Sequence, residues 1–227
     1  MDEVKALELT VSGLVTLGAA YIGARFAFRF NTQQQANSLR DSRVEECNRA
    51  MLNLFRQFNT LASYRKQWLE AHRTSPGRHL NVQANSPQDA APHAVNVAAL
   101  AFLLSTDAHA VPGELALLDD GYRNCIQLIN TRSAMHREEY QPALEAAVKH
   151  YGATTRIHGE LVEEWVGPRI VASLRQATDD LYEIVDSTID AFIKAGVDVT
   201  PRLKQVFPGA RIISFVPLEG YVAKAAA

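Results

Sequence analysis

The most regular hydrophobic pattern of the chain lies between residues 44 and 69. Its positions alternate steps of three and four residues, which is the spacing along one face of an α-helix. The positions in register are Val44, Cys47, Met51, Leu54, Phe58, Leu61, Arg65 and Trp68, and Ala50, Phe55, Ala62 and Leu69 widen the stripe. Such a stripe could form a coiled coil between chains or one helix of an intramolecular bundle, and the extra flanking apolar positions favour the bundle.

Helical spacing recurs in the second half of the chain. Pro112 opens a pattern that continues to His136, and Pro142 is expected to end or kink that helix. The next pattern, ALEAAVKHYG, closes at Gly152. A last pattern runs over residues 160–195, with a bend expected at Gly167 and Pro168.

The connections between these helices differ in character. Residues 74–92 carry prolines and no apolar face, which predicts a long surface connection, and the apolar run 93–106 predicts a short buried helix. Gly196 is expected to cap the last helix. The predicted fold class is therefore all-α, an antiparallel helical bundle over residues 44–196.

Residues 9–30 are apolar enough to suggest a transmembrane helix that continues into the bundle. No residue from 9 to 24 is charged, and counting on to residue 28 gives a helix of about 30 Å. The alternative is a buried helix of a soluble bundle. The residues expected at the membrane interface are Tyr21, Arg25, Phe26 and Arg29.

Small residues form two rows on the same segment. Such rows let another helix approach closely, so they predict self-association or a membrane-protein partner. The first row is Ser12, Thr16, Ala20 and Ala24, and the second includes Ala19 and Gly23.

The arginines that follow this segment predict its orientation. Arg25, Arg29, Arg40 and Arg43 come after it, whereas only Lys5 precedes it. Cytoplasmic flanks of membrane helices carry the excess of basic residues, so the N-terminus is expected outside and the bulk of the chain in the cytoplasm.

The predicted organisation has five parts. It comprises a short extracytoplasmic N-terminus over 1–8, the transmembrane helix 9–30, a helical stalk 31–43, the cytoplasmic bundle 44–196 and an extended tail 197–227. Within the tail, the β-branched and aromatic run 210–217 is expected to pack on the bundle, or else to pair with another chain or the membrane.

Composition narrows the possible chemistry. The 227 residues are 47% hydrophobic with a formal net charge of −2, which disfavours DNA and RNA as partners. The two cysteines, Cys47 and Cys125, have no metal-ligand spacing and are expected to be buried thiols. Motifs for a di-iron site, a zinc hydrolase, a phosphate loop and a serine hydrolase are absent from the sequence, so no cofactor, metal or enzymatic activity is predicted.

A row of acidic residues at helical spacing lies in the last helix. Asp179, Glu183, Asp186 and Asp190 are predicted to form a solvated face, paired with Arg175 and Lys194 at steps of four residues.

Two short segments resemble the catalytic pattern of HEPN ribonucleases, in which an arginine precedes a histidine by a few residues. The segments are Arg65 to His72 and Arg73 to His79. The resemblance implies that the arginine would stabilise a phosphate and the histidine would assist proton transfer.

A broader resemblance covers the first third of the chain. The segments GARFAFRFN and NRAMLNLFRQFNTLASYRKQWLE are similar to uncharacterised bacterial single-pass membrane-anchored helical proteins. The resemblance implies an anchor in the bacterial inner membrane with a cytoplasmic helical domain. Polar residues such as Arg56, Gln57 and Asn59 would then bind the connection or a partner.

The function expected from these patterns is a structural or interaction module that binds the lipid bilayer and either forms a homo-oligomer or binds a membrane partner. A HEPN-like ribonuclease, and a membrane-acting effector in stress or phage defence, are the alternatives.

Overall fold

The computed structural model describes residues 2–152 and 159–214, and within them all regular structure is helical. The side chains of residues 2–16, Ala19, Gly159 and Glu160 lie outside the described part. The chain divides into two compact units, Met1–Glu45 and Glu46–Ala227. The all-α prediction is confirmed.

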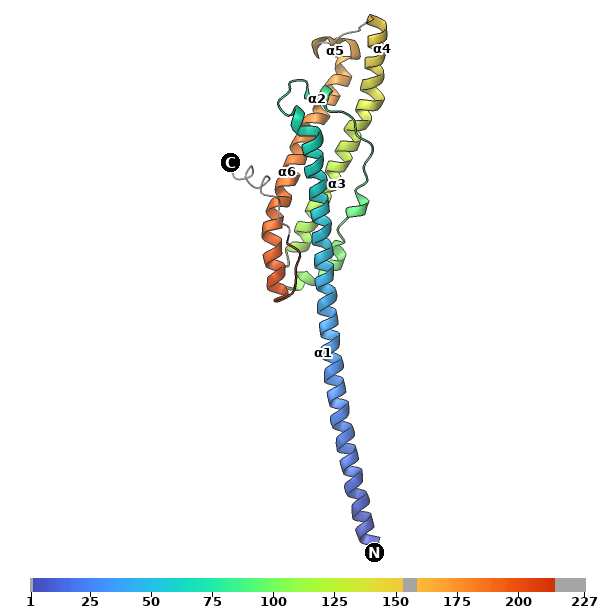
Figure 1. Ribbon diagram of the computed structural model, residues 1–227, viewed down its shortest axis with the longest axis vertical. Coiled ribbons are helices and arrows are strands. Elements are labelled where there is room, and N and C mark those ends of the chain that lie inside the picture. The colour runs from blue at the N-terminus through green and yellow to red at the C-terminus, as the bar shows by residue number, and fades with distance from the viewer. Residues whose placement is uncertain (1, 153–158, 215–227) are drawn as a thin grey trace. The chain divides into compact units, whose positions relative to one another are not determined.

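The first unit belongs to helix α1, Asp2–Tyr64, coloured blue in Figure 1. Every side chain from residue 20 to residue 43 is exposed, and the polar run 31–43 is helical. Over the residues that the structure describes, no helix is both long enough and apolar enough to cross a membrane. The transmembrane helix predicted over residues 9–30 therefore has no support from the structure.

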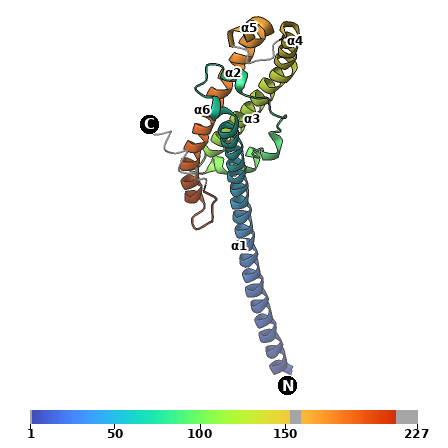
Figure 2. The same ribbon diagram turned by 45° about the horizontal axis from the view of Figure 1, so that its top comes forward.

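The second unit is built on three long helical elements (Figures 1 and 2). They are the last part of α1, then α3 with its continuation into α4, and α6. The elements that follow α1 are η1 Arg65–Leu69, η2 Glu70–His72, α2 Arg78–Asn81, η3 Ala91–His93, η4 Val97–Ser105, α3 Val111–Met135, η5 His136–Tyr140, α4 Gln141–Tyr151, α5 Gly159–Val166 and α6 Pro168–Val206.

Helix α6 is antiparallel to both of its long neighbours. The ring of Phe58 in α1 meets that of Phe192 with 6.5 Å between centroids, and Arg65 reaches back to Asp186. In α3, Arg132 bonds Thr178 near the beginning of α6. In these contacts the residue numbers rise along α1 and α3 while they fall along α6, so α6 is antiparallel to both helices.

The α1 and α3 helices, however, run in the same direction. Gln57 in α1 bonds Asp119 in α3, and three residues further along Thr60 bonds Tyr122. Residues 70–110 return along the bundle as short helices, η2, α2, η3 and η4, joined by irregular chain, so α3 starts again from the same end. The prediction of a wholly antiparallel bundle is wrong in this pair of helices.

The predicted stripe of α1 forms one side of the core. Cys47, Met51, Leu54, Phe58 and Leu61 are at most 4% exposed. They pack with the apolar faces of α3 and α6, which include Tyr122, Ile129, Leu181, Val185 and Ile189. Phe55, predicted to widen the stripe, is 38% exposed.

Proline and glycine determine two of the irregularities between helices. Pro142 was expected to end or kink its helix, and the π-turn η5 lies directly before it, where the longer hydrogen-bonding step removes the need for a proline N–H. Gly167, at φ 106°, breaks α5 from α6 completely, whereas a bend was expected. Gly152 caps α4 at φ 67°, as predicted.

The last helix extends beyond its predicted end. Gly196 lies buried inside α6, which continues to Val206, so the prediction that it caps the helix and that an extended tail begins at 197 is wrong. The reason is that Val199 and Leu203 continue the buried stripe past the glycine.

The apolar run before α3 and the start of the tail both pack on the bundle. The apolar run predicted as a short buried helix forms the 3₁₀-helix η4, with Leu100 and Leu103 buried and Leu104 exposed. Asn48 in α1 binds the tail: its side-chain amide donates to the Arg211 carbonyl at 2.9 Å and accepts from the Ile213 N–H at 2.8 Å. Residues 215–217 of the predicted run lie outside the described residues.

The break at Gly167 gives a test of this architecture. Gly167→Ala should lower the free energy of unfolding by about 1–3 kcal/mol, because an alanine at this positive φ is strained. No atom lies within 4 Å of an added Cβ, so the cost is a backbone cost. Gly113→Ala in α3, which also meets nothing within 4 Å, is the matched control and should stabilise by up to about 1 kcal/mol. Urea unfolding followed by circular dichroism measures both, and equal effects would contradict the break.

Candidate functional site

A buried arginine holds the connection against the bundle. Arg132 in α3 is 1% exposed, and its guanidinium donates to the carbonyl oxygens of His79 at 3.0 Å, of Gln83 at 3.1 Å and of Val82. Its Nε donates to Thr178 Oγ1 in α6 at 3.3 Å. Carbonyl groups at the end of a helix carry partial negative charge, so the end of α2 solvates this cation. Burial lowers the pKa of Arg132 to about 10, which leaves it charged at neutral pH.

A buried carboxylate holds the next part of the connection. Asp119 in α3 is 4% exposed and accepts from Gln57 Nε2 at 2.6 Å, from the Val95 N–H at 3.0 Å and from Arg123 Nε at 2.8 Å. Gln57 also donates to the His93 carbonyl at 2.8 Å. Gln57 was expected to bind the connection over residues 74–92 or a partner, and it contacts His93, the residue that follows that connection.

The acidic row of α6 holds the turn after α1. Asp186 accepts two hydrogen bonds from Arg73, at 2.6 and 3.0 Å, and a longer one from Arg65 at 3.5 Å. Asp179 accepts from Nε and Nη2 of Arg78 at 3.0 and 2.8 Å. The Tyr182 ring lies between these pairs, with the Arg78 guanidinium carbon 4.6 Å from its centroid.

This pairing differs from the predicted one. Arg175 pairs with Glu163 at 3.2 Å, whereas Asp179 was its expected partner. Among the described residues, no group of three or more histidine, cysteine or acidic side chains is placed to hold a metal ion.

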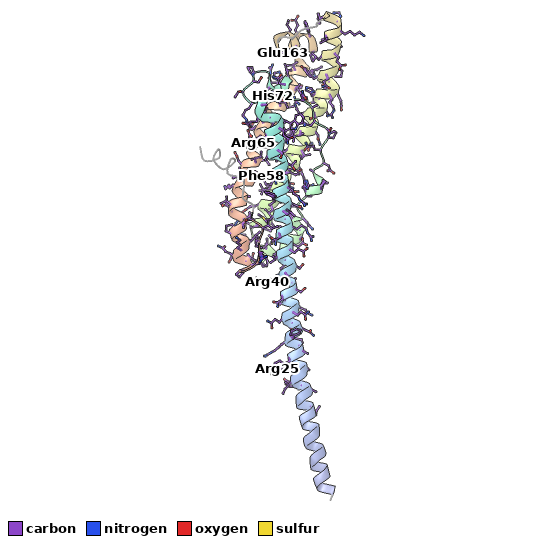
Figure 3. All side chains as sticks on the ribbon, in the orientation of Figure 1. Arg25, Arg40, Phe58, Arg65, His72 and Glu163 are labelled. Carbon is purple, nitrogen blue, oxygen red and sulfur yellow. The ribbon has the colours of Figure 1, made fainter. Side chains whose placement is uncertain are left out.

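The structure brings together some of the residues proposed for a ribonuclease. Arg65 and Arg73 converge on Asp186, so their guanidinium groups already contact a carboxylate. His79 is buried, and its pKa is lowered by burial first and by the field of Arg175 second. His72 lies half-buried in η2 (Figure 3).

The other predicted residues lie on the exposed segment of α1, where Figure 3 labels Arg25 and Arg40. Tyr21 and Phe26 are 67% and 69% exposed. Arg25, Arg29, Ala20, Gly23 and Ala24 are also exposed. The side chains of Ser12, Thr16 and Ala19 lie outside the described residues.

Large apolar side chains are numerous on this segment. Each is between 54% and 73% exposed: Leu17, Tyr21, Ile22, Phe26, Phe28, Phe30 and Leu39. Steps of four and seven residues place Leu17, Tyr21 and Phe28 on one face, and steps of four place Ile22, Phe26 and Phe30 on a roughly opposite face. The segment is therefore apolar on two sides.

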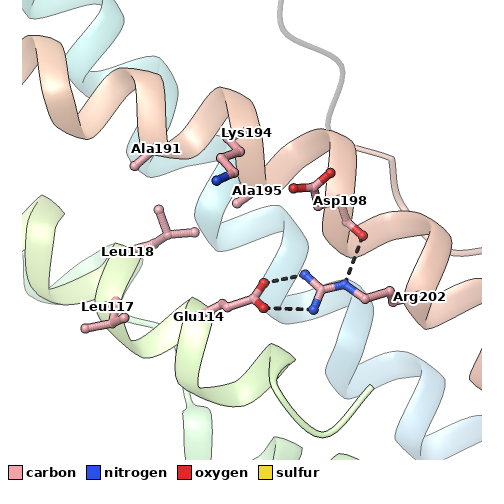
Figure 4. Close-up of a pocket in the computed structure, with 8 residues that line it drawn as sticks. All are labelled: Glu114, Leu117, Leu118, Ala191, Lys194, Ala195, Asp198 and Arg202. Carbon is pink, nitrogen blue, oxygen red and sulfur yellow. Dashed lines mark hydrogen bonds and ion pairs between the residues drawn. The ribbon is translucent and has the colours of Figure 1, made fainter. Parts of the chain in front are cut away.

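A groove between α3 and α6 is a feature that the sequence patterns did not indicate (Figure 4). Its volume is about 800 Å³, and Leu117, 74% exposed, lies at its edge. Arg202 closes one end with two hydrogen bonds to Glu114, one of 2.8 Å, and these bonds lower the pKa of the glutamate. Lys194 and Ala195 line the other side.

Comparison with known proteins found no relative of this chain. No family model, no curated protein and no solved structure matches it.

The role of Arg132 can be tested by substitution. Arg132→Met should lower the free energy of unfolding by about 3–5 kcal/mol, because it leaves several buried carbonyl oxygens without donors. Arg169→Met in α6 removes an exposed guanidinium and should cost about 1 kcal/mol or less.

Urea unfolding measures both costs, and hydrogen exchange locates them. The Arg132 variant should lose amide protection over residues 78–85 first. Equal unfolding free energies for the two variants would contradict a holding role for Arg132.

Proposed function

We propose that the protein is a membrane-anchored helical module whose N-terminal part of α1 lies in a lipid bilayer and associates there with a second copy or a membrane partner. The observation that carries the proposal is the set of large apolar side chains left 56% to 73% exposed on residues 17–30. Contiguous apolar surface of this kind marks protein or membrane contact sites. Burying one such side chain is worth about 1.5–3 kcal/mol, so the set strongly favours a covered state.

The distribution of these residues supports lipid as the covering medium. A single partner helix covers one face, which suits either Leu17, Tyr21 and Phe28 or the opposite set but not both. Lipid surrounds a helix on every side. The proposed anchor takes in residues 9–30, so it includes residues 9–16, whose side chains precede the described ones.

The two arginines are compatible with this placement. Arg25 and Arg29 lie toward the end of the proposed anchor, where long side chains extend along the helix and bring their charge to the headgroups. With Arg40 and Arg43 they support the proposed orientation, in which the bundle faces the cytoplasm of a bacterial cell and the N-terminus lies outside the inner membrane.

The small residues support a helix partner within the membrane. Ala20, Gly23 and Ala24 recur at helical spacing on the side away from Arg25. A Cβ added at Gly23 would meet nothing within 4 Å, so the packing of the chain itself does not require glycine there. A closely approaching second helix would require it.

Neither alternative function gains a supporting observation. The ribonuclease needs arginine donors for a phosphate, and Arg65 and Arg73 donate to Asp186. The membrane-acting effector uses the same anchor and adds no site of its own.

Membrane extraction tests the anchor. The full chain should stay in the membrane fraction through alkaline carbonate and leave it only with detergent. Leu17→Asp combined with Ile22→Asp should release the protein, because each charge near the middle of the span costs about 2.5–3.5 kcal/mol. Leu39→Asp, also at an exposed apolar side chain but beyond the span, is the control and should behave as the parent. Release of the parent chain by carbonate would remove the anchor.

Association in detergent micelles tests the small-residue face. Gly23→Leu should weaken self-association at least about 10-fold, equivalent to about 1.4 kcal/mol, because leucine keeps the backbones apart. Gly18→Leu is the matched control: its added side chain also meets nothing within 4 Å, and it lies on the side of Arg25. Sedimentation should show oligomers for the control and monomers for Gly23→Leu. An unchanged oligomer in both would show that this face does not mediate association.

A further inference from the structure

A second cavity lies where the π-turn η5 faces the end of α2. Its volume is about 580 Å³, within the range of roughly 300–1,000 Å³ typical of small-molecule sites. Its lining residues come from two segments, 80–84 and 136–144. The first segment is held by Arg132 through the carbonyl groups of Val82 and Gln83, so this wall has a defined position.

The π-turn supplies the polar groups of the other wall. His136, Arg137 and Tyr140 all belong to η5 and all line the cavity. A π-turn widens the helix by one residue, and such turns are frequent at functional sites. Pro142 has no N–H to donate, which favours a π-turn directly before it. This π-turn determines which side chains face the cavity.

The cavity has a positive character. Arg137 is the one charged residue among those lining it, and its Nη1 donates to the Asn85 carbonyl. The positive charge of Arg132 also acts on His136 of this wall, and its guanidinium donates to carbonyl oxygens and to Thr178. Over the described residues, neither guanidinium has a carboxylate partner.

His136 responds to this environment. Burial first, and then the fields of Arg132 and Arg137, lower the pKa of His136 to about 4, so its imidazole is neutral at pH 7. It is 5% exposed, its ring lies 5.1 Å from that of Tyr140, and its Nδ1 has no hydrogen-bond partner within the described part of the chain.

The remaining walls are apolar or carry amides. Leu80, Ala84 and Leu144 offer apolar contact, and the side chains of Asn81, Gln83 and Gln141 offer amide groups. We propose that this cavity binds an organic carboxylate with an apolar body, its charge directed to Arg137 and its body against the apolar wall. This site belongs to the bundle and is independent of the proposed membrane anchor.

Photolabelling of the full chain in a nonionic detergent tests the site. The probe is 4-azidobenzoate, with labelled residues located by mass spectrometry. Labelling should concentrate in 80–84 and 136–144, and benzoate should suppress it at concentrations at least about 10-fold below those of benzamide, its neutral counterpart. Labelling spread over the chain, or confined to residues 17–39, would overturn the proposal, as would equal competition by the two compounds.

Substitutions separate charge from shape. Arg137→Gln should reduce specific labelling at least about 10-fold, whereas Arg137→Lys should retain most of it and Arg169→Gln, at an exposed position on α6, should have no effect. Ala84→Leu keeps every charge but narrows the cavity, so it should also reduce labelling. Circular dichroism checks the fold of each variant. Wild-type labelling in both Arg137→Gln and Ala84→Leu would place the carboxylate elsewhere and contradict the site.

Discussion

The bundle depends on a charge in its interior that has no carboxylate to neutralise it among the described residues. The guanidinium of Arg132 takes the carbonyl oxygens at the end of α2 and in the chain after it, with Thr178 of α6 as a further partner. Residues 78–83 must therefore lie between α3 and α6. That position brings Arg78 onto the Tyr182 ring and makes residues 80–84 one wall of the cavity beside η5. A satisfied buried cation thus fixes both a connection and a candidate ligand site.

Helix α1 uses apolar residues in two different ways. From residue 47 onward, its apolar side chains form one stripe that the bundle buries, as Met51 and Leu61 show. In residues 17–30 the apolar side chains lie on two faces and stay exposed. The first set of side chains needs no outside partner, because α3 and α6 of the same chain cover it. The second requires a medium or partner from outside the chain, and this requirement is the physical basis for the proposed membrane anchor.

Much of the fold follows from local sequence, and the long-range pairings do not. The α1 stripe, the start of α3 near Pro112 and the cap at Gly152 were predictable because each signal lies within a few residues. The end of α6 was not, since burial of Val199 and Leu203 outweighs the capping tendency of Gly196. Polar residues within a helical pattern suggest solvent, so the buried roles of Asp119 and Arg132 had no local signal. The pairing of Arg73 with Asp186 joins residues more than 100 positions apart, and the acidic row indicated a charged face without identifying its partner.

The proposed placement of the N-terminal part of α1 in lipid, with the bundle in water, is tested most directly by the accessibility of spin labels in a bilayer. Both native cysteines are buried, so a label introduced at Ile22 or Leu39 is selective. A label at Ile22 should collide more with oxygen dissolved in lipid than with a water-soluble nickel chelate, and a label at Leu39 should show the reverse. High accessibility to the nickel chelate at both positions would contradict this placement.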